Sequence, residues 1–91
     1  MTVSRTLVIV NQRGLHARAS ARFVTAVANL SPDTRVEVAK GPHCAAGGSI
    51  LGLMMLGAAR GDTIELRVSG ADADAVADQL AQLVSSGFGE E

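Results

Sequence analysis

The residues best suited to chemistry lie in one short segment, Gly14-Leu15-His16-Ala17-Arg18. A run with helical periodicity follows, which places His16 at the start of a helix, where unpaired N–H groups and the helix dipole attract anions. The same field favours the neutral, nucleophilic form of an imidazole. A phosphoryl group on one ring nitrogen would lie against these N–H groups, and Arg18 could add charge-assisted hydrogen bonds. The segment therefore suits a histidine that carries a phosphoryl group.

A simpler interpretation stays open on these residues alone, in which His16 is a helix-capping residue and Arg18 a solvated charge. No second histidine, cysteine or carboxylate lies at ligand spacing around His16, which argues against a metal site. His43 and Cys44 are the other pair of soft ligands. Because adjacent residues of a strand point to opposite faces, we interpret this pair as structural.

Four segments have the pattern of strands. Polar and apolar residues alternate in 34–40 and in 63–69, which is typical of a sheet with one wet face. Segment 3–10 is a third strand, and the turn at Gly41-Pro42 leads into a short fourth strand at 43–46. The wet face favours an antiparallel sheet.

Three segments have the pattern of helices. Apolar residues recur every three or four positions in 17–30 and 72–86, and over a shorter stretch in 49–56. The order along the chain is strand, helix, strand, strand, short helix, strand, helix. Helices clustered on one face of an antiparallel sheet predict a two-layer α+β domain.

The short helix has two features of its own. Ser49 follows Gly47-Gly48 and is a preferred N-cap residue, so a structural role is expected of it. Spacing of three and four divides the apolar residues into two faces, formed by Ile50, Leu51 and Met54 and by Leu53 and Leu56. One face can enter the core while the other is exposed as an adaptable docking surface. The alternative is that the whole helix is core.

The composition excludes several classes of protein. The 91 residues suffice for one domain, 1–91, with a modest core. Eight basic and nine acidic residues give a net charge of −1, so the chain lacks the excess positive charge that would attract nucleic acid or an anionic membrane. No segment reaches the roughly 20 apolar residues of a spanning helix, and the apolar run at 7–10 is too short for the h-region of a secretory signal. A single cysteine, Cys44, cannot form an internal disulfide, so we expect a cytoplasmic protein.

Two separated motifs resemble a known family. Gly14-Leu15-His16-Ala17-Arg18 resembles the active-site motif of HPr, the histidine-containing phosphocarrier of the bacterial phosphoenolpyruvate-dependent phosphotransferase system. Residues 48–56 resemble the regulatory-serine segment of that family, and Phe23-Val24, Gly61 and Phe88-Gly89-Glu90 fit as well. The resemblance implies an open-faced sandwich of four antiparallel strands in the order 1-4-2-3, covered on one side by three helices.

The resemblance also implies roles for individual residues. Phosphorylated enzyme I would pass its phosphoryl group to the δ nitrogen of His16, which would pass it to an enzyme IIA, without a bound cofactor. Arg18 and the backbone amide of Ala17 would stabilise the phosphate, and an HPr kinase/phosphorylase would phosphorylate Ser49. Ala19 stands where the family usually has proline, which should loosen the first helical turn without removing a reactive group.

The expected partner-binding residues are Leu15, Ile50, Leu51 and Met54. The implied protein is a monomeric, stoichiometric carrier rather than a free-standing enzyme. Two other classes stay open: a regulatory or ligand-binding α+β module that is never phosphorylated, and an interaction-only regulator acting through Ser49. A ligand-binding module would be expected to carry a larger pocket or a dimerising edge.

Overall fold

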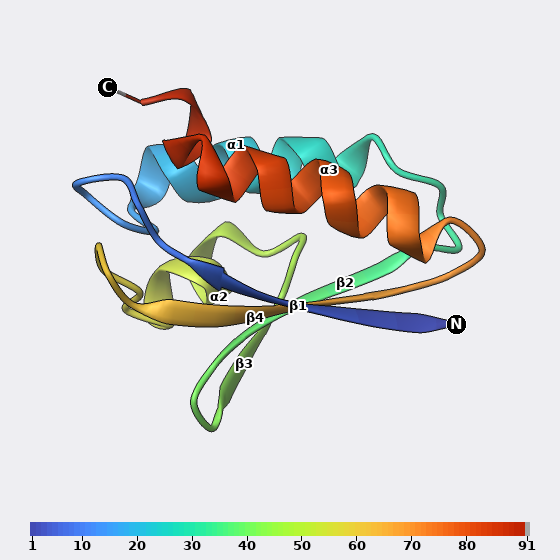
Figure 1. The fold of residues 1–91 in the computed structure, drawn as a ribbon. Coiled ribbons are helices and arrows are strands. Elements are labelled where there is room, and N and C mark those ends of the chain that lie inside the picture. The colour runs from blue at the N-terminus through green and yellow to red at the C-terminus, as the bar shows by residue number, and fades with distance from the viewer. Residues whose placement is uncertain (91) are drawn as a thin grey trace.

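A computed structural model describes residues 1–90 as a sheet with helices gathered over one face (Figure 1). In chain order the elements are β1 (Thr2–Val8), α1 (Ala17–Ala28), β2 (Arg35–Lys40), β3 (His43–Ala46), α2 (Ile50–Met55), β4 (Thr63–Ser69), α3 (Ala73–Ser85) and a short 3₁₀ turn, η1 (Gly87–Gly89). Within residues 1–90, none of the helices is long and apolar enough to cross a membrane. The predicted α+β architecture is confirmed.

The sheet has the order β1-β4-β2-β3, and each neighbouring pair of strands is antiparallel, as predicted. The register pairs Val68 of β4 with Val3 on one side and Val36 on the other. The apolar residues of these strands therefore share one face. Ile64, Leu66 and Val68 are buried on that face beneath the helices, and the opposite face carries the polar residues of the alternation.

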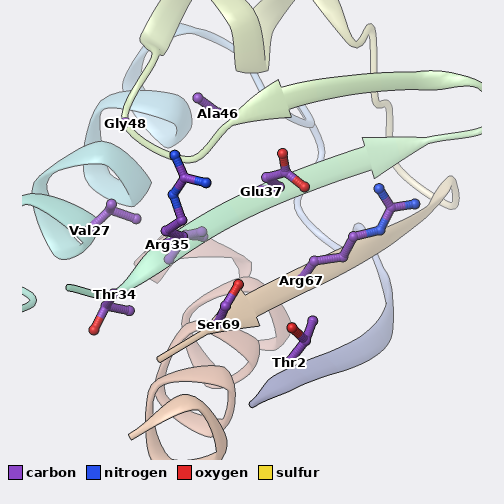
Figure 2. Close-up of a pocket in the computed structure, with 10 residues that line it drawn as sticks. Thr2, Val27, Thr34, Arg35, Glu37, Ala46, Gly48, Arg67 and Ser69 are labelled. Carbon is purple, nitrogen blue, oxygen red and sulfur yellow. The ribbon is translucent and has the colours of Figure 1, made fainter. Parts of the chain in front are cut away.

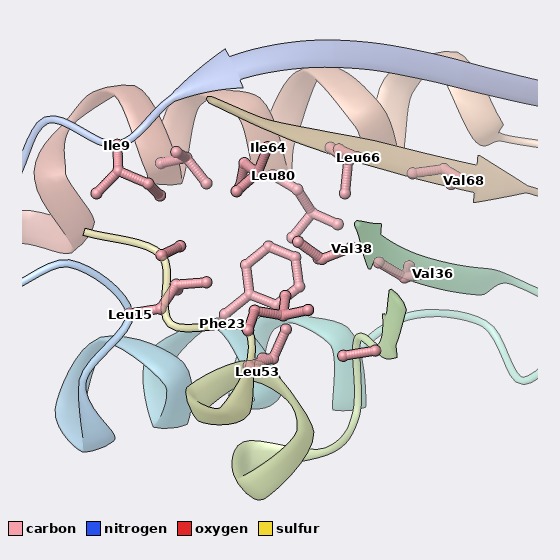
Figure 3. Close-up of a cluster of buried hydrophobic side chains, with 14 of the residues drawn as sticks. Ile9, Leu15, Phe23, Val36, Val38, Leu53, Ile64, Leu66, Val68 and Leu80 are labelled. Atoms are coloured by element: carbon pink, nitrogen blue, oxygen red, sulfur yellow. The ribbon is translucent and has the colours of Figure 1, made fainter. Parts of the chain in front are cut away.

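The core joins the sheet to α1 and α2 through one aromatic side chain. Phe23 of α1 is buried in the same cluster as Val38 of β2, Leu53 of α2 and Leu66 of β4 (Figure 3). Burying a side chain of this size contributes roughly 1.5–3 kcal/mol. The packing of Phe23 therefore fixes the first turns of α1, which follow His16, against the rest of the molecule.

Two elements end two residues earlier than predicted. α1 stops two residues short of position 30 because Asn29 caps it and Pro32 disfavours helical backbone at the residue before it. β1 stops at Val8 rather than at position 10, although the N–H of Ile9 still donates to the carbonyl of Asp62 at 2.9 Å. Neither difference changes which side chains enter the core.

Candidate functional site

The loop between β1 and α1 packs closely against the segment that follows α2 and is hydrogen-bonded to it. Gly14 has a φ of +62°, and a Cβ at this position would lie 2.3 Å from the carbonyl oxygen of Ala58. Glycine is required here for both the left-handed conformation and the close approach. The backbone N–H of Leu15 donates to the same Ala58 carbonyl at 3.0 Å. These contacts determine where the next residue, His16, is placed.

His16 is the N-cap residue of α1 and has extended backbone. Its Nδ1 accepts a hydrogen bond from the backbone N–H of Arg18 at 3.3 Å, and its carbonyl accepts from the N–H of Ser20 at 2.9 Å. Because Nδ1 accepts, the hydrogen-bond network places the proton of the neutral ring on Nε2. The predicted position at the helix start is confirmed, His16 also caps the helix, and the lone pair of Nδ1 faces the first turn of α1.

A carboxylate from the far end of the chain completes the surroundings of the ring. Oε2 of Glu90 lies 2.6 Å from Nε2 of His16, and Oε1 accepts a hydrogen bond from the side-chain amide of Asn11 at 3.0 Å. The Asn11 N–H, together with the contact to His16, holds the pKa of Glu90 below its ordinary value. Glu90 is therefore ionised near neutral pH and accepts the Nε2 proton in a hydrogen bond.

Sequence reasoning missed Glu90 because it lies 74 positions from His16. The turn η1 brings it back towards α1, and the segment that follows α3 lies beside that helix in Figure 1. Phe88 is buried with a φ of 58°, and its carbonyl accepts a hydrogen bond from the guanidinium of Arg22. The one available signal was the segment Phe88-Gly89-Glu90, which matched the family without suggesting a role for the carboxylate.

Three arginines line a hollow that also includes the ring. Arg13, Arg18 and Arg22 line a hollow of about 350 Å³ together with His16 and Glu90. Arg18 is exposed and takes part in none of the ion pairs found within residues 1–90. A guanidinium in this position can meet an anion on the ring with two parallel hydrogen bonds.

The pair His43 and Cys44 lies on β3, outside this hollow. Both residues are exposed, and Sγ of Cys44 lies 3.8 Å from Nη1 of Arg67. In the part of the chain that the structure describes, no three or more His, Cys, Asp or Glu residues are grouped to hold a metal ion. The pair therefore takes no part in the His16 site.

Ser49 is the N-cap residue of α2, as expected. Its Oγ accepts a hydrogen bond from the backbone N–H of Gly52 at 2.9 Å, and its carbonyl accepts from the N–H of Leu53 at 3.0 Å. The side chain is partly exposed. The hydroxyl thus has a structural role and is also placed at the edge of the surface that α2 presents.

The α2 surface consists of four large apolar side chains, Ile50 (41% exposed), Leu51 (68%), Met54 (40%) and Met55 (76%). Leu53 and Leu56 are buried in the core, so the predicted division into two faces is confirmed and the fully buried alternative is wrong. Met55 was not predicted. The expectation that Leu15 belongs to the contact surface needs correction, because its side chain is buried in the core.

A larger hollow of about 530 Å³ lies over β2 and β4 (Figure 2). Its charged lining residues are Arg35, Glu37 and Arg67. Arg67 is paired with Glu65 at 2.6 Å, which raises the pKa of the guanidinium. None of the predicted site residues lines this hollow.

The fold and the site together define a class of protein: a small open-faced α+β sandwich that presents a histidine at a helix N-terminus and an exposed apolar surface on α2. A family model described as "PTS HPr component phosphorylation site" matches residues 3–86. The chain belongs to the HPr family and is a phosphocarrier of the bacterial phosphotransferase system, for which the family implies enzyme I and an enzyme IIA as partners.

Relatives and solved structures agree with this assignment. The chain is 40% identical over 88 residues to the phosphocarrier protein HPr of Neisseria meningitidis, covering 97% of each chain. It is 36% identical to the phosphocarrier protein NPr of Shewanella violacea, covering 97% of this chain and 94% of that one. The crystal structure of HPr from Thermoanaerobacter tengcongensis superposes with a TM-score of 0.89 at 35% identity, covering 98% of each chain.

Proposed function

We propose that Nδ1 of His16 accepts the phosphoryl group from phosphorylated enzyme I and passes it to an enzyme IIA. The orientation of the ring carries this proposal: Nδ1 faces the first turn of α1 with its lone pair, while Nε2 is held by Glu90. In each transfer an N–P bond forms at the acceptor as the bond between phosphorus and the donor breaks, and the proton on Nε2 stays on the ring. The protein supplies placement and charge stabilisation, which is most of what phosphoryl transfer requires.

The first turn of α1 and Arg18 stabilise the charge of the bound phosphoryl group. Once Nδ1 is substituted, the N–H of Arg18 that it accepted from is available to a phosphoryl oxygen, and the amide of Ala17 belongs to the same turn. The Arg18 guanidinium adds donors from the side. Hydrogen bonds to a charged group contribute roughly 1.5–3 kcal/mol each. Glu90 balances the positive charge that the protonated, substituted ring acquires.

The α2 surface is the docking site for successive partners. A carrier meets its donor and its acceptor in turn, so one exposed surface beside the reactive group serves both. α2 packs against α1, and the segment after α2 accepts a backbone hydrogen bond from the loop that precedes His16. Exposed methionine and leucine side chains adapt to different partner surfaces, which suits this use of Leu51, Met54 and Met55.

Ser49 regulates docking when an HPr kinase/phosphorylase modifies it. A phosphate at this N-cap would add about −1.5 to −2 charges next to the α2 surface. The start of a helix tolerates that charge locally, so the fold is retained. A partner that covers the surface must desolvate the phosphate, and transfer from enzyme I is slowed.

Intact mass after incubation with phosphoenolpyruvate and enzyme I tests the assignment of His16. The protein should gain one acid-labile, base-stable phosphoryl group, and adding an enzyme IIA should remove it. His16→Ala should abolish the gain with the fold intact, whereas the matched variant His43→Ala should behave as the wild type. Acid-labile labelling of His16→Ala would overturn the proposal.

The regulatory role of Ser49 can be tested with two substitutions that both preserve the helix cap. Asp and Asn are equally good N-cap residues, so Ser49→Asp and Ser49→Asn differ mainly in charge. We expect Ser49→Asp to slow acceptance from enzyme I by about tenfold, equivalent to about 1.4 kcal/mol, and Ser49→Asn to leave it unchanged. Incubation with the kinase and ATP should add an acid-stable phosphate that Ser49→Asn lacks. Equal transfer rates in the two variants would leave Ser49 as a helix cap alone.

We further propose that the carrier acts as a monomer in the cytoplasm. Cys44 is the one cysteine in the sequence, so the fold does not depend on an oxidising compartment. Light scattering of the purified protein at micromolar concentration should give the mass of one chain. A stable dimer mass would contradict this part of the proposal.

A further inference from the structure

We infer that Asn11 is a positioning residue for phosphotransfer, because its side-chain amide holds the Glu90 carboxylate against Nε2 of His16 and so selects the tautomer with an unprotonated Nδ1. The inference rests on the proposed function of His16. It adds a residue that lies outside the motif around the histidine and that sequence reasoning did not single out.

The three side chains form a continuous chain of hydrogen bonds. Nδ2 of Asn11 donates to the carbonyl of Gly14 at 2.8 Å and to Oε1 of Glu90 at 3.0 Å. The second carboxylate oxygen, Oε2, lies 2.6 Å from Nε2 of His16. Asn11 is 5% exposed, so water competes little for its amide. Each oxygen of Glu90 thus has its own partner, and the carboxylate cannot move away from this position without losing one of them.

The orientation of the Asn11 amide follows from its surroundings. With the amide reversed, Oδ1 would face the Gly14 carbonyl and the Glu90 carboxylate, two acceptors that repel it. In the observed orientation Oδ1 is buried without a partner, the one such side-chain atom found within residues 1–90. A buried acceptor without a partner is unfavourable. The two N–H groups of Asn11 therefore account for an amide at this position. If Asn11 only stabilised the loop, the hydrogen bond to Gly14 would suffice.

The effect on the ring passes through the charge and position of Glu90. The Asn11 N–H is the largest of the contacts that lower the pKa of this carboxyl, ahead of His16 itself. An ionised, stationary carboxylate accepts a hydrogen bond from Nε2–H and so favours that tautomer. If the carboxylate turned away or took up a proton, the tautomer protonated at Nδ1 would become populated. That form has no lone pair on Nδ1 and cannot attack phosphorus from it.

NMR of the unphosphorylated protein tests the inference without any partner. Asn11→Asp keeps the size of the side chain but removes both N–H donors, and Asn11→Ala removes the group. In both variants the long-range ¹H–¹⁵N pattern of neutral His16 should shift from the Nε2–H tautomer to a mixture, and the carboxyl ¹³C signal of Glu90 should titrate at higher pH. Asn29→Ala is the matched control, because Asn29 donates to the Thr25 carbonyl on the exposed side of α1. A purely structural Asn11 would lower Tm and leave both signals unchanged, which would overturn the inference.

Transfer rates in a double-mutant cycle then show whether Asn11 acts through Glu90. Asn11→Ala should slow acceptance from enzyme I by about tenfold, which is near the lower end of the scale for losing one hydrogen bond to a charged group. Glu90→Ala should slow it at least as much, and the double variant should match Glu90→Ala within about twofold. Losses that multiply would overturn the inference. Absence of phosphorylation in the wild type would instead overturn the proposed function, while the NMR signals still report on Asn11.

Discussion

Replacing Gly14 with alanine should destabilise the protein and slow phosphotransfer, because this glycine lets the loop before His16 pass against the segment after α2. A φ of +62° costs an L residue about 1–2 kcal/mol. The added Cβ would also lie 2.3 Å from the Ala58 carbonyl oxygen and 2.9 Å from Cα of Ala59, and neither backbone atom can rotate away. Relieving this overlap breaks the hydrogen bond from Leu15 to Ala58, which adds about 1 kcal/mol.

The expected loss for Gly14→Ala is therefore about 2–3 kcal/mol, or roughly 8–24 °C in Tm for a domain of this size. Gly41→Ala is the matched control, since Gly41 has a φ of +56° with nothing within 4 Å of an added Cβ. It carries the backbone strain alone, so its Tm should lie roughly 4–8 °C above that of Gly14→Ala. Calorimetry gives both values, and rapid-quench transfer from enzyme I should be slowed only in Gly14→Ala. Equal Tm values with equal transfer rates would refute the reasoning about close approach.

Three further predictions follow from the site. Arg18→Ala should slow transfer in both directions by about tenfold to a hundredfold while leaving Tm within a few degrees, because the variant loses a hydrogen bond to the charged phosphoryl group but no ion pair. Unchanged rates in rapid-quench measurements would make Arg18 a plain surface charge. Met54→Glu should raise the KM for enzyme I at nearly constant Tm, whereas truncating buried Leu53 to alanine should lower the free energy of unfolding by about 2–5 kcal/mol. A large drop in Tm for Met54→Glu would show that this face is core. The pKa of Glu90 is held below its ordinary 4.5, chiefly by the Asn11 N–H, so its ionised form stabilises the fold above pH 4.5 and that contribution is lost as pH falls through the lowered pKa. The Tm difference between wild type and Glu90→Gln should accordingly be present at pH 7 and shrink at pH 3, and a difference that grows on acidification would contradict this sign.

Local patterns in the sequence were enough to predict the elements and the start of each important helix. Alternation in β2 and β4 determined which side chains face the core, because a strand has a strict period of two. The apolar spacing of α2 separated buried Leu53 from exposed Met54, because residues three and four apart share one face of a helix. The helical periodicity after His16 and the serine before Ile50 indicated helix starts, which the structure confirms.

Features that depend on tertiary contacts could not be predicted in this way. Leu15 is a single residue between a glycine and a helix start, so no periodicity shows which way its side chain points, and its burial was missed. Glu90 reaches His16 because Phe88 and its neighbouring glycines adopt positive φ and turn the chain back over α1. Positive φ at a phenylalanine has no sequence signal. The role of Asn11 in turn depends on where Glu90 is placed.

The nitrogen that carries the phosphoryl group is the most direct test of the central claim. The protein, labelled with ¹⁵N in its histidines and phosphorylated by enzyme I and phosphoenolpyruvate, can be examined by ³¹P–¹⁵N correlation at alkaline pH, where the phosphoramidate is stable. Phosphorus should couple to Nδ1 of His16, whose lone pair faces the first turn of α1, while Nε2 keeps its proton against Glu90. Coupling to Nε2 of His16, or to the ring of His43, would contradict the account.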